Sequence, residues 1–316
     1  MNIAVSDNRP RGMQRLKLFF ALSRTPHGLL DMATPGLAAL LWLGELPPPM
    51  IIVLGLITAF AGYTAVYAVN DLVDYRTDKE KLRLGGFQDS RNYLDAAIIR
   101  HPLAQGLLSI REGLMWAVGW SVVALFGAFL LNPFCILIFL AGCALETAYC
   151  LMWNVTPFRN VVSGVVKTCG PIAGVFAVDR DPSFSFLVLL FIWLFFWEIG
   201  GQNIPNDWAE IEEDQKFRAR TMLVRYGAVT ASAIVLGTLV LSVGVNLWLL
   251  GVSAQGFSLL YLAVSLGIGF VLLLLPAFHL YQTRKRQDAL TLFGRASYYP
   301  LACLILVSVR IFIVHF

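Results

Sequence analysis

The chain contains 316 residues, of which 58% are hydrophobic and 14% are charged, and its mean hydropathy is +0.69. Soluble domains carry about 25% charged residues, so this composition excludes a soluble enzyme and indicates a polytopic membrane protein. The formal net charge is +4. A basic excess can indicate a polyanionic partner, but the basic residues here are distributed as membrane topology demands, and we expect no nucleic-acid partner.

Nine apolar stretches are long enough to cross a bilayer as helices of roughly 20 residues. They cover residues 27–45, 50–70, 113–131, 134–152, 160–178, 184–204, 227–249, 257–280 and 297–314. The expected fold is therefore an all-α polytopic membrane protein, a bundle of nine transmembrane helices that forms a single domain over residues 1–316.

The basic residues predict the orientation of this bundle. Of the 24 Lys and Arg residues, 21 fall in the N-terminal segment and in alternate loops, one lies in a loop of the opposite side, and two lie inside spans. The positive-inside rule then places the N-terminus in the cytoplasm. The long polar segments 71–112 and 205–226 lie on the same side and would form cytoplasmic cap loops. We expect an integral protein of a prokaryotic plasma (inner) membrane.

One acidic pattern occurs twice, 136 positions apart, each time directly after an apolar span. The first copy contains Asn70, Asp71, Asp74 and Asp78, and the second contains Asn206, Asp207, Glu210 and Asp214. In a continuous helix the acids at positions i, i+3 and i+7 fall within an arc of about 60°. We refer to these two sets of four residues as the first and the second acidic motif.

Six carboxylates at two membrane boundaries repel one another and lose hydration, so such a site persists only with compensating cations. A solvated helix end is the structural alternative, but two copies with the same internal spacing make it the weaker one. Oxygen ligands rich in carboxylates suit Mg²⁺, which proteins hold together with substrate phosphates. The motifs therefore predict a magnesium-dependent site for a diphosphate at the membrane surface.

The motifs after the second and sixth spans resemble those of the UbiA superfamily of intramembrane prenyltransferases. Residues 100–106, Arg-His-Pro-Leu-Ala-Gln-Gly, are similar to the family's Arg-Pro-Leu-x-x-Gly stretch, with His101 as an insertion. Tyr149, the Pro-Phe-Arg run at 157–159 and Glu198 resemble further family positions. The chain departs from the family at Glu210, where Asp is commoner, and in the longer stretch 82–99.

The resemblance implies a reaction and a set of roles. In this family Mg²⁺ bridges the acids to a polyprenyl diphosphate, the prenyl tail lies in a lipid-facing tunnel, and a small aromatic acceptor attacks the allylic cation. The family also suggests a 4-hydroxybenzoate-like acceptor. The residues implied as ligands of two Mg²⁺ ions are Asn70, Asp74, Asp78, Asn206, Glu210 and Asp214. Asp71, Asp207 and Tyr149 are implied in catalysis, and Glu198 in substrate binding.

Basic side chains are expected to complete the diphosphate site, because Lys and Arg pair with phosphate oxygens. The candidates by position are Arg24, Lys79, Arg159 and Lys216; Lys81, Arg83, Arg218 and Arg220 are not separable from them by sequence. Membrane topology alone would explain most of these residues. The four histidines lack metal-ligand spacing and are predicted to be structural or incidental.

Lys167 lies about seven residues inside the fifth span. An intramembrane lysine indicates function, catalysis included, although snorkelling to the cytoplasmic surface explains it equally well. We expect it to pair with Glu146 or Glu198, or to meet a carboxylate of the acceptor.

Two other functions remain open from the sequence. A terpene cyclase on the same scaffold would use the same metals and diphosphate without an acceptor. A divalent-cation transporter would use the acids as its ion path, but the sequence provides no matching acidic exit on the opposite side. A phospholipid-headgroup transferase is disfavoured because its Asp-Gly-x-x-Ala-Arg run is absent.

Overall fold

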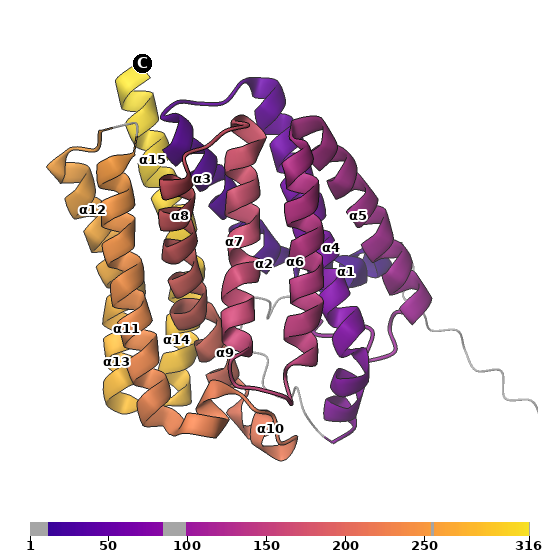
Figure 1. Ribbon diagram of the computed structural model, residues 1–316. Coiled ribbons are helices and arrows are strands. Elements are labelled where there is room, and N and C mark those ends of the chain that lie inside the picture. Colours follow the sequence, from indigo (N-terminus) through magenta and orange to yellow (C-terminus); the bar gives the residue numbers. More distant parts are fainter. Residues whose placement is uncertain (1–11, 85–98, 254–255, 316) are drawn as a thin grey trace, which may run out of the picture.

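The computed structural model describes residues 12–84, 99–253 and 256–315. Every regular element in these ranges is a helix, and no strand occurs among them, which confirms the all-α class. Most of the expected insertion at 82–99 and the first eleven residues lie outside the described residues. Figure 1 shows the long helices running side by side in one bundle.

Eight helical stretches of the described residues are long and apolar enough to cross a membrane. They are Pro49–Arg83, Ile110–Leu131, Pro133–Leu151, Arg159–Val178, Phe184–Ala209, Met222–Val252, Leu259–Thr283 and Arg286–Val314. The expected count of nine is therefore not confirmed. The stretch expected as the first span is divided into α2 (Thr25–Asp31) and α3 (Ala33–Leu43), neither of which is long enough alone.

The break between α2 and α3 has a local cause. Pro35 has no N–H with which to bond the carbonyl of Asp31, four residues earlier. The hydroxyl of Thr34 donates to that carbonyl instead, at 2.9 Å. A side chain thus replaces the missing backbone donor, and the chain turns at Met32 with Asp31 at the end of α2.

The first acidic motif lies on one continuous helix, α4 (Pro49–Arg83), of 35 residues. At 1.5 Å per residue this helix is about 52 Å long, well over the ~30 Å of hydrocarbon in a bilayer. Its C-terminal turns, which carry the motif, therefore extend past the apolar span. The helical spacing expected for the first motif is confirmed.

The second motif does not lie on one continuous helix, so the helical arc considered for its acids does not apply there. The sixth span consists of α8 (Phe184–Trp197), the π-helix η1 (Glu198–Asn203) and α9 (Ile204–Ala209). Pro205 has no N–H for the carbonyl four residues earlier, and the wider turn of η1 precedes it. The chain then leaves helical geometry at Glu210 (φ −102°, ψ 13°), and α10 (Ile211–Lys216) follows.

The remaining helices complete the bundle. They are α1 (Met13–Leu22), α5 (Ile110–Leu131), α6 (Pro133–Leu151), α7 (Arg159–Val178), α11 (Met222–Val252), α12 (Leu259–Gly269), η2 (Phe270–Leu274), α13 (Leu275–Thr283), α14 (Arg286–Ser297) and α15 (Tyr299–His315). The stretch 281–296 lies between the last two expected spans, 257–280 and 297–314, and was therefore counted among the loops. It contains instead the end of α13 and most of α14, whose Ala289 and Leu292 are fully buried.

The bundle has a tightly packed half and a hollow half. Trp193, Trp197 and Tyr299 belong to a large buried core shared by α8, α11, α14 and α15. In Figure 1, α4, α5 and α6 lie on the other side of α7. The C-terminal end of α4 and the short helices α9 and α10 lie at the same end of the molecule, which brings the two motifs to one end.

Candidate active site

A cavity of about 480 Å³ extends through the hollow half. Asn70 and Asp71 of the first motif and Asn206 and Glu210 of the second line one end of it, and Val178 at the end of α7 lines the other. The wall between them is mostly apolar and includes Ile52, Leu56, Ala59, Ile138, Ala173 and Ala177. A ligand with a polar head and a long apolar tail fits this distribution.

In the first motif, two acids converge on one histidine. Nδ1 of His101 lies 2.8 Å from Oδ1 of Asp71 and 2.7 Å from Oδ2 of Asp78. Asn70 donates from Nδ2 to Oε1 of Glu146 at 2.6 Å. Asp74, on the same helix, is half-buried.

His101 was expected to be incidental, and the structure corrects this. Burial opposes its protonation, but the charges of Asp78 and Asp71 and their hydrogen bonds outweigh burial and raise the pKa of His101 to about 9. His101 also adopts a left-handed backbone conformation (φ 49°). Its position in the family-like stretch 100–106 was the signal that could have identified it.

The acids of the second motif have three different partners. Asp207 accepts from Arg159 at 2.6 Å, Glu210 from Arg100 at 2.8 Å, and Asp214 from the Trp153 indole at 3.2 Å. All these contacts involve side chains from loops or helix ends that meet at this end of the bundle.

The two acids of this motif outside the spans titrate differently. Burial raises the pKa of Glu210, but the Arg100 and Lys81 charges outweigh it and lower that pKa to about 2. Burial, together with the nearby charges of Asp207 and Glu210, raises the pKa of Asp214 to about 7. Asp214 is therefore the weaker acid of the two, because Arg100 pairs with Glu210 whereas no cation of the described residues forms an ion pair with Asp214.

The two motifs are linked by side chains in two places. Arg100 binds the second motif and His101 binds the first, so one short loop holds both. The ammonium of Lys81, from α4, lies 4.3 Å from the Trp153 ring, and that indole donates to Asp214. The sequence analysis had placed Arg100 in the family-like stretch without giving it a partner, had not identified Trp153, and had left Lys81 among several equal candidates.

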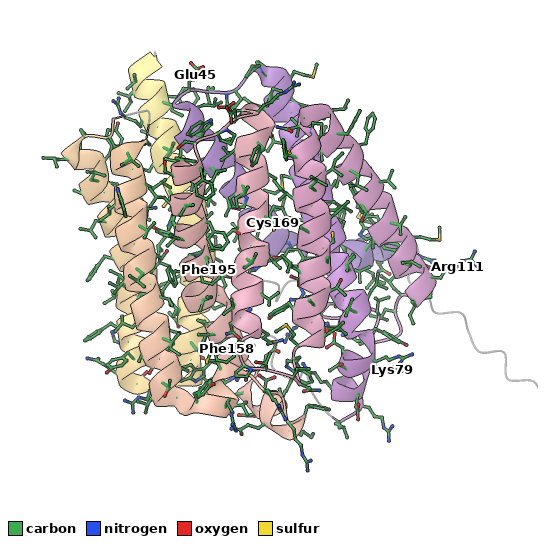
Figure 2. All side chains as sticks on the ribbon, viewed as in Figure 1. Glu45, Lys79, Arg111, Phe158, Cys169 and Phe195 are labelled. Carbon is green, nitrogen blue, oxygen red and sulfur yellow. The ribbon has the colours of Figure 1, made fainter. Side chains whose placement is uncertain are left out.

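The basic candidates divide into two groups. Arg24 lines the cavity and donates to Oδ1 of Asn70 at 3.4 Å, and Arg159 is buried against Asp207. Lys79 and Lys216 do not line the cavity, and both are exposed. Lys79 lies 3.3 Å from the hydroxyl of Tyr75 on its own helix (Figure 2), and Lys216 donates to the carbonyl of Leu84 at 2.5 Å.

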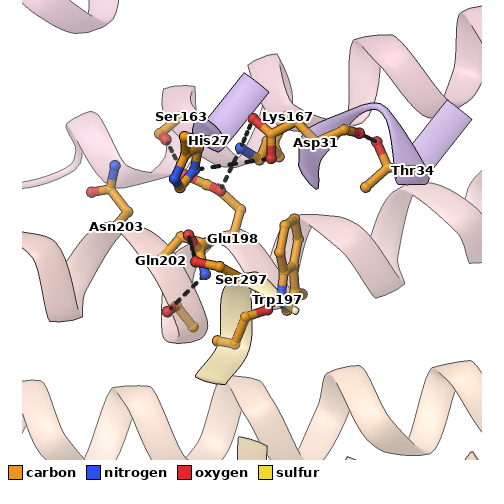
Figure 3. A network of polar contacts seen from close by, with 12 residues as sticks. His27, Asp31, Thr34, Ser163, Lys167, Trp197, Glu198, Gln202, Asn203 and Ser297 are labelled. Carbon is orange, nitrogen blue, oxygen red and sulfur yellow. Dashed lines mark hydrogen bonds and ion pairs between the residues drawn. The ribbon is translucent and has the colours of Figure 1, made fainter. Parts of the chain in front are cut away.

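Lys167 lies deeper in the cavity wall (Figure 3). Its Nζ donates to Oδ2 of Asp31 at 2.8 Å and lies 3.8 Å from Oε2 of Glu198. The expected pairing with Glu198 is confirmed, whereas the closer partner, Asp31, was missed. Asp31 interrupts the apolar stretch 27–45, and this was the signal for it.

Tyr149 also lines the cavity. Its hydroxyl accepts from Nδ2 of Asn203 at 2.9 Å, and the Arg159 guanidinium lies 4.7 Å from its ring centre. The ring is therefore held by a hydrogen bond at one end and by a cation–π contact over its face.

The oxygen atoms of the motifs fit a hard divalent cation. Oδ2 of Asp71, Asp207 and Asp214 is buried, and none has a hydrogen-bond partner among the described residues. Buried carboxylate oxygens without partners are costly unless something else compensates them. Carboxylate oxygens of Asp71 and Asp78 lie within 4.8 Å of each other, a spacing that could hold a metal ion.

Two relatives of known name match much of the chain. A protein named protoheme IX farnesyltransferase, from Ruthia magnifica subsp. Calyptogena magnifica, is 29% identical over 181 residues, which cover 55% of this chain and 58% of that protein. The chain thus matches less than two thirds of that relative's length. A 4-hydroxybenzoate octaprenyltransferase from Nitrosomonas eutropha is 26% identical over 228 residues, 71% of this chain and 73% of the relative.

Solved structures share the fold. A UbiA homolog from Aeropyrum pernix K1 superposes with a TM-score of 0.70 at 18% identity, covering 92% of this chain and 98% of its own. A UbiA homolog from Archaeoglobus fulgidus bound to GPP and Mg²⁺ gives 0.65 at 16% identity, covering 92% and 99%. The profile described as the UbiA prenyltransferase family matches residues 32–304. The chain therefore belongs to the UbiA prenyltransferase family, a family of enzymes.

Proposed function

We propose that the protein is a Mg²⁺-dependent prenyltransferase that moves a polyprenyl group from its diphosphate to a small aromatic acceptor. The observation that supports this most directly is one cavity with acidic motifs at one end and apolar walls along its length. The diphosphate would lie at the acidic end and the tail along the apolar walls. Because the predicted cytoplasmic loops carry both motifs, the site would open to the cytoplasm.

The residues proposed to hold two Mg²⁺ ions are Asn70, Asp74, Asp78, Asn206, Glu210 and Asp214, with Asp71 beside them. When bound, the ions would supply positive charge that stabilises the departing diphosphate. Arg24 would add a guanidinium to the diphosphate from the cavity wall. Arg159 would act differently, because its charge is already paired with Asp207. It would position that carboxylate rather than bind substrate.

The proposed reaction is an alkylation of the acceptor ring. The C1–O bond of the prenyl diphosphate breaks, and its electron pair leaves with the diphosphate. A ring carbon of the acceptor forms a bond to C1, and the proton on that carbon then passes to a base, which restores aromaticity. Asp207 is our candidate base, because one oxygen is held by Arg159 while its Oδ2 has no donor among the described residues.

The test uses the purified full chain with labelled prenyl diphosphates of several lengths and a panel of aromatic acceptors. We expect a prenylated acceptor with Mg²⁺ and none with EDTA. Asp74→Asn and Asp214→Asn should each reduce turnover by at least about 100-fold, since each removes an anionic ligand. Asp181→Asn, at an exposed loop residue, is the matched control and should retain turnover.

Three results would overturn the proposal. Full turnover in EDTA would remove the metal from the reaction, and full turnover in either motif variant would remove that motif. Hydrocarbon products that form without any acceptor would identify a cyclase instead.

A further inference from the structure

A group of three buried charged side chains lines the cavity (Figure 3). It contains Asp31 at the end of α2, Lys167 in α7 and Glu198 at the start of η1. Lys167 is eight residues beyond Arg159 on the same helix, so it lies about 12 Å further along the helix axis. A small acceptor that approaches the reacting end of the prenyl group from this part of the cavity would meet these three side chains.

The positive charge of this group is already paired. The Lys167 ammonium is 2.8 Å from one carboxylate and 3.8 Å from the other. Asp31 Oδ2 also accepts from the Tyr67 hydroxyl at 2.5 Å. A carboxylate on the acceptor would therefore have to displace Asp31 or Glu198, so Lys167 is not placed to receive it.

The charges that line the cavity also disfavour an acceptor that carries a carboxylate. Three carboxylates line the cavity between the first motif and Lys167, those of Asp31, Glu146 and Glu198, against the fixed cations of Lys167 and Arg24; the His27 imidazole lies 4.0 Å from Asp31. A further carboxylate, brought in by an acceptor, would be repelled in a low-dielectric setting where like charges interact strongly.

Two buried oxygen atoms of the wall need a donor. Oε2 of Glu198 and Oδ1 of Asn203 have no hydrogen-bond partner in the described part of the chain, and each residue is 6% exposed. The Lys167 ammonium, at 3.8 Å from Oε2, is beyond hydrogen-bond distance. An amide oxygen and the oxygen of an ionised carboxylate only accept, so a ligand that satisfies both atoms in that state must donate.

Both side chains are held in place by their neighbours. Ser163 donates to the other Glu198 oxygen, Oε1, at 2.7 Å. Asn203 donates its Nδ2 to the Tyr149 hydroxyl at 2.9 Å. Glu198 is the first residue of η1 and Asn203 is the last. Because a π-helix bonds residues five apart, its geometry brings these two residues to one side of the helix.

We infer that the acceptor is an uncharged aromatic hydroxyl compound without a carboxylate, whose O–H donates to Oε2 of Glu198. This inference rests on the proposed function and specifies its acceptor class. It departs from the 4-hydroxybenzoate-like acid that the family resemblance suggests. A hydroxyl that donates to a carboxylate also enriches its ring in electrons, which favours attack by a ring carbon on the prenyl group.

The first experiment compares three ligands that share one ring: 4-hydroxybenzoate, its methyl ester, and methyl 4-methoxybenzoate. Binding to the full chain in detergent is measured by calorimetry with Mg²⁺ and inorganic diphosphate present. We expect the hydroxyl ester to bind at least about ten-fold more tightly than the acid, and at least about ten-fold more tightly than the methoxy ester, which lacks the donor.

The second experiment tests Glu198 itself. Glu198→Gln removes the negative charge, so the preference for the ester over the acid should fall toward one, while Glu45→Gln, at an exposed residue, should keep it. If Glu198→Gln does not fold, the ligand series on the unchanged protein decides alone. The inference is overturned if the acid binds as tightly as the ester, if the methoxy ester binds as tightly as the hydroxyl ester, or if no ester binds.

A separate arm distinguishes this inference from the proposed function. Geranyl diphosphate is titrated into the same protein with and without Mg²⁺. Mg²⁺-dependent binding without the ester preference would overturn the acceptor class alone. Absence of Mg²⁺-dependent binding would remove the proposed function, and the acceptor inference would fall with it.

Discussion

The buried pair of Arg159 and Asp207 allows a quantitative prediction of stability. Arg159 is 8% exposed, Asp207 is 2% exposed, and the guanidinium lies 2.6 Å from the carboxylate. Arg159→Met would leave a buried carboxylate without its cation. Breaking a buried pair from one side costs about 3–5 kcal/mol, because the remaining charge is uncompensated. We expect the variant to lose that much free energy of unfolding.

The double variant Arg159→Met/Asp207→Leu distinguishes the cost of one unpaired buried charge from the cost of replacing the whole pair. When both charges are replaced by apolar groups of similar size, the net effect is often close to zero. We therefore expect the double variant to lie within about 1 kcal/mol of the unchanged protein, so that the coupling energy of the cycle is at least about 2 kcal/mol. Asp207→Leu alone would leave the Arg159 guanidinium without this carboxylate, in cation–π contact with the Tyr149 ring.

The assay is reversible unfolding in mixed detergent–SDS micelles, followed by tryptophan fluorescence. Arg111→Met, at an exposed arginine (Figure 2), is the matched control and should change the free energy of unfolding by no more than about 0.5 kcal/mol. A loss below about 1 kcal/mol for Arg159→Met would refute the reasoning, because Asp207 would then have another source of compensation.

Three further predictions concern charge and packing. His101→Ala should lower the thermal midpoint without Mg²⁺ and enlarge the rise that Mg²⁺ produces, since it removes a cation from two acids, whereas the exposed His279→Ala should change neither. Because the pKa of Asp214 is about 7, its carboxyl is mostly protonated at pH 6 and mostly ionised at pH 8. Calorimetry in buffers of different ionisation enthalpy should therefore show a proton release on Mg²⁺ binding that falls from pH 6 to pH 8, and Asp214→Asn should lose this component. Gly174→Ala should cost about 1–3 kcal/mol in the same unfolding assay, because its Cβ would lie 2.5 Å from a backbone oxygen of α3, while Gly237→Ala meets nothing within 4 Å and should cost less than 1 kcal/mol.

The helices were predictable where apolar length alone decides them. The prediction was wrong where polarity was taken as a loop signal, as at 281–296, because α14 buries one face and exposes the other. The first span shows a different limit. Pro35 was visible in the sequence, but the sequence did not show that Thr34 would replace its missing hydrogen bond and let the chain break at Met32.

The arrangement of the first acidic motif was predictable because its information is local. Spacing along a helix places Asp71, Asp74 and Asp78 together before any tertiary contact forms. The cations were not predictable in the same way, since membrane topology requires many of them on one side whether or not they bind anything. Lys79 and Lys216 had the right position in sequence and face away, whereas His101 had no expected role and contacts two acids.

From the sequence we inferred that clustered acids need cations to coexist. In the structure, side chains provide some of this compensation but not all of it. The side chains that provide it are His101 on the first motif and Arg159 and Arg100 on the second. Yet Oδ2 of Asp71 and of Asp214 remains without a donor among the described residues. A site compensated fully by its own side chains would gain little from Mg²⁺, and one without them would depend on the metal to fold. Partial compensation instead keeps the acids in place while leaving oxygens for a metal and its diphosphate, so metal binding and folding should be separable in this protein.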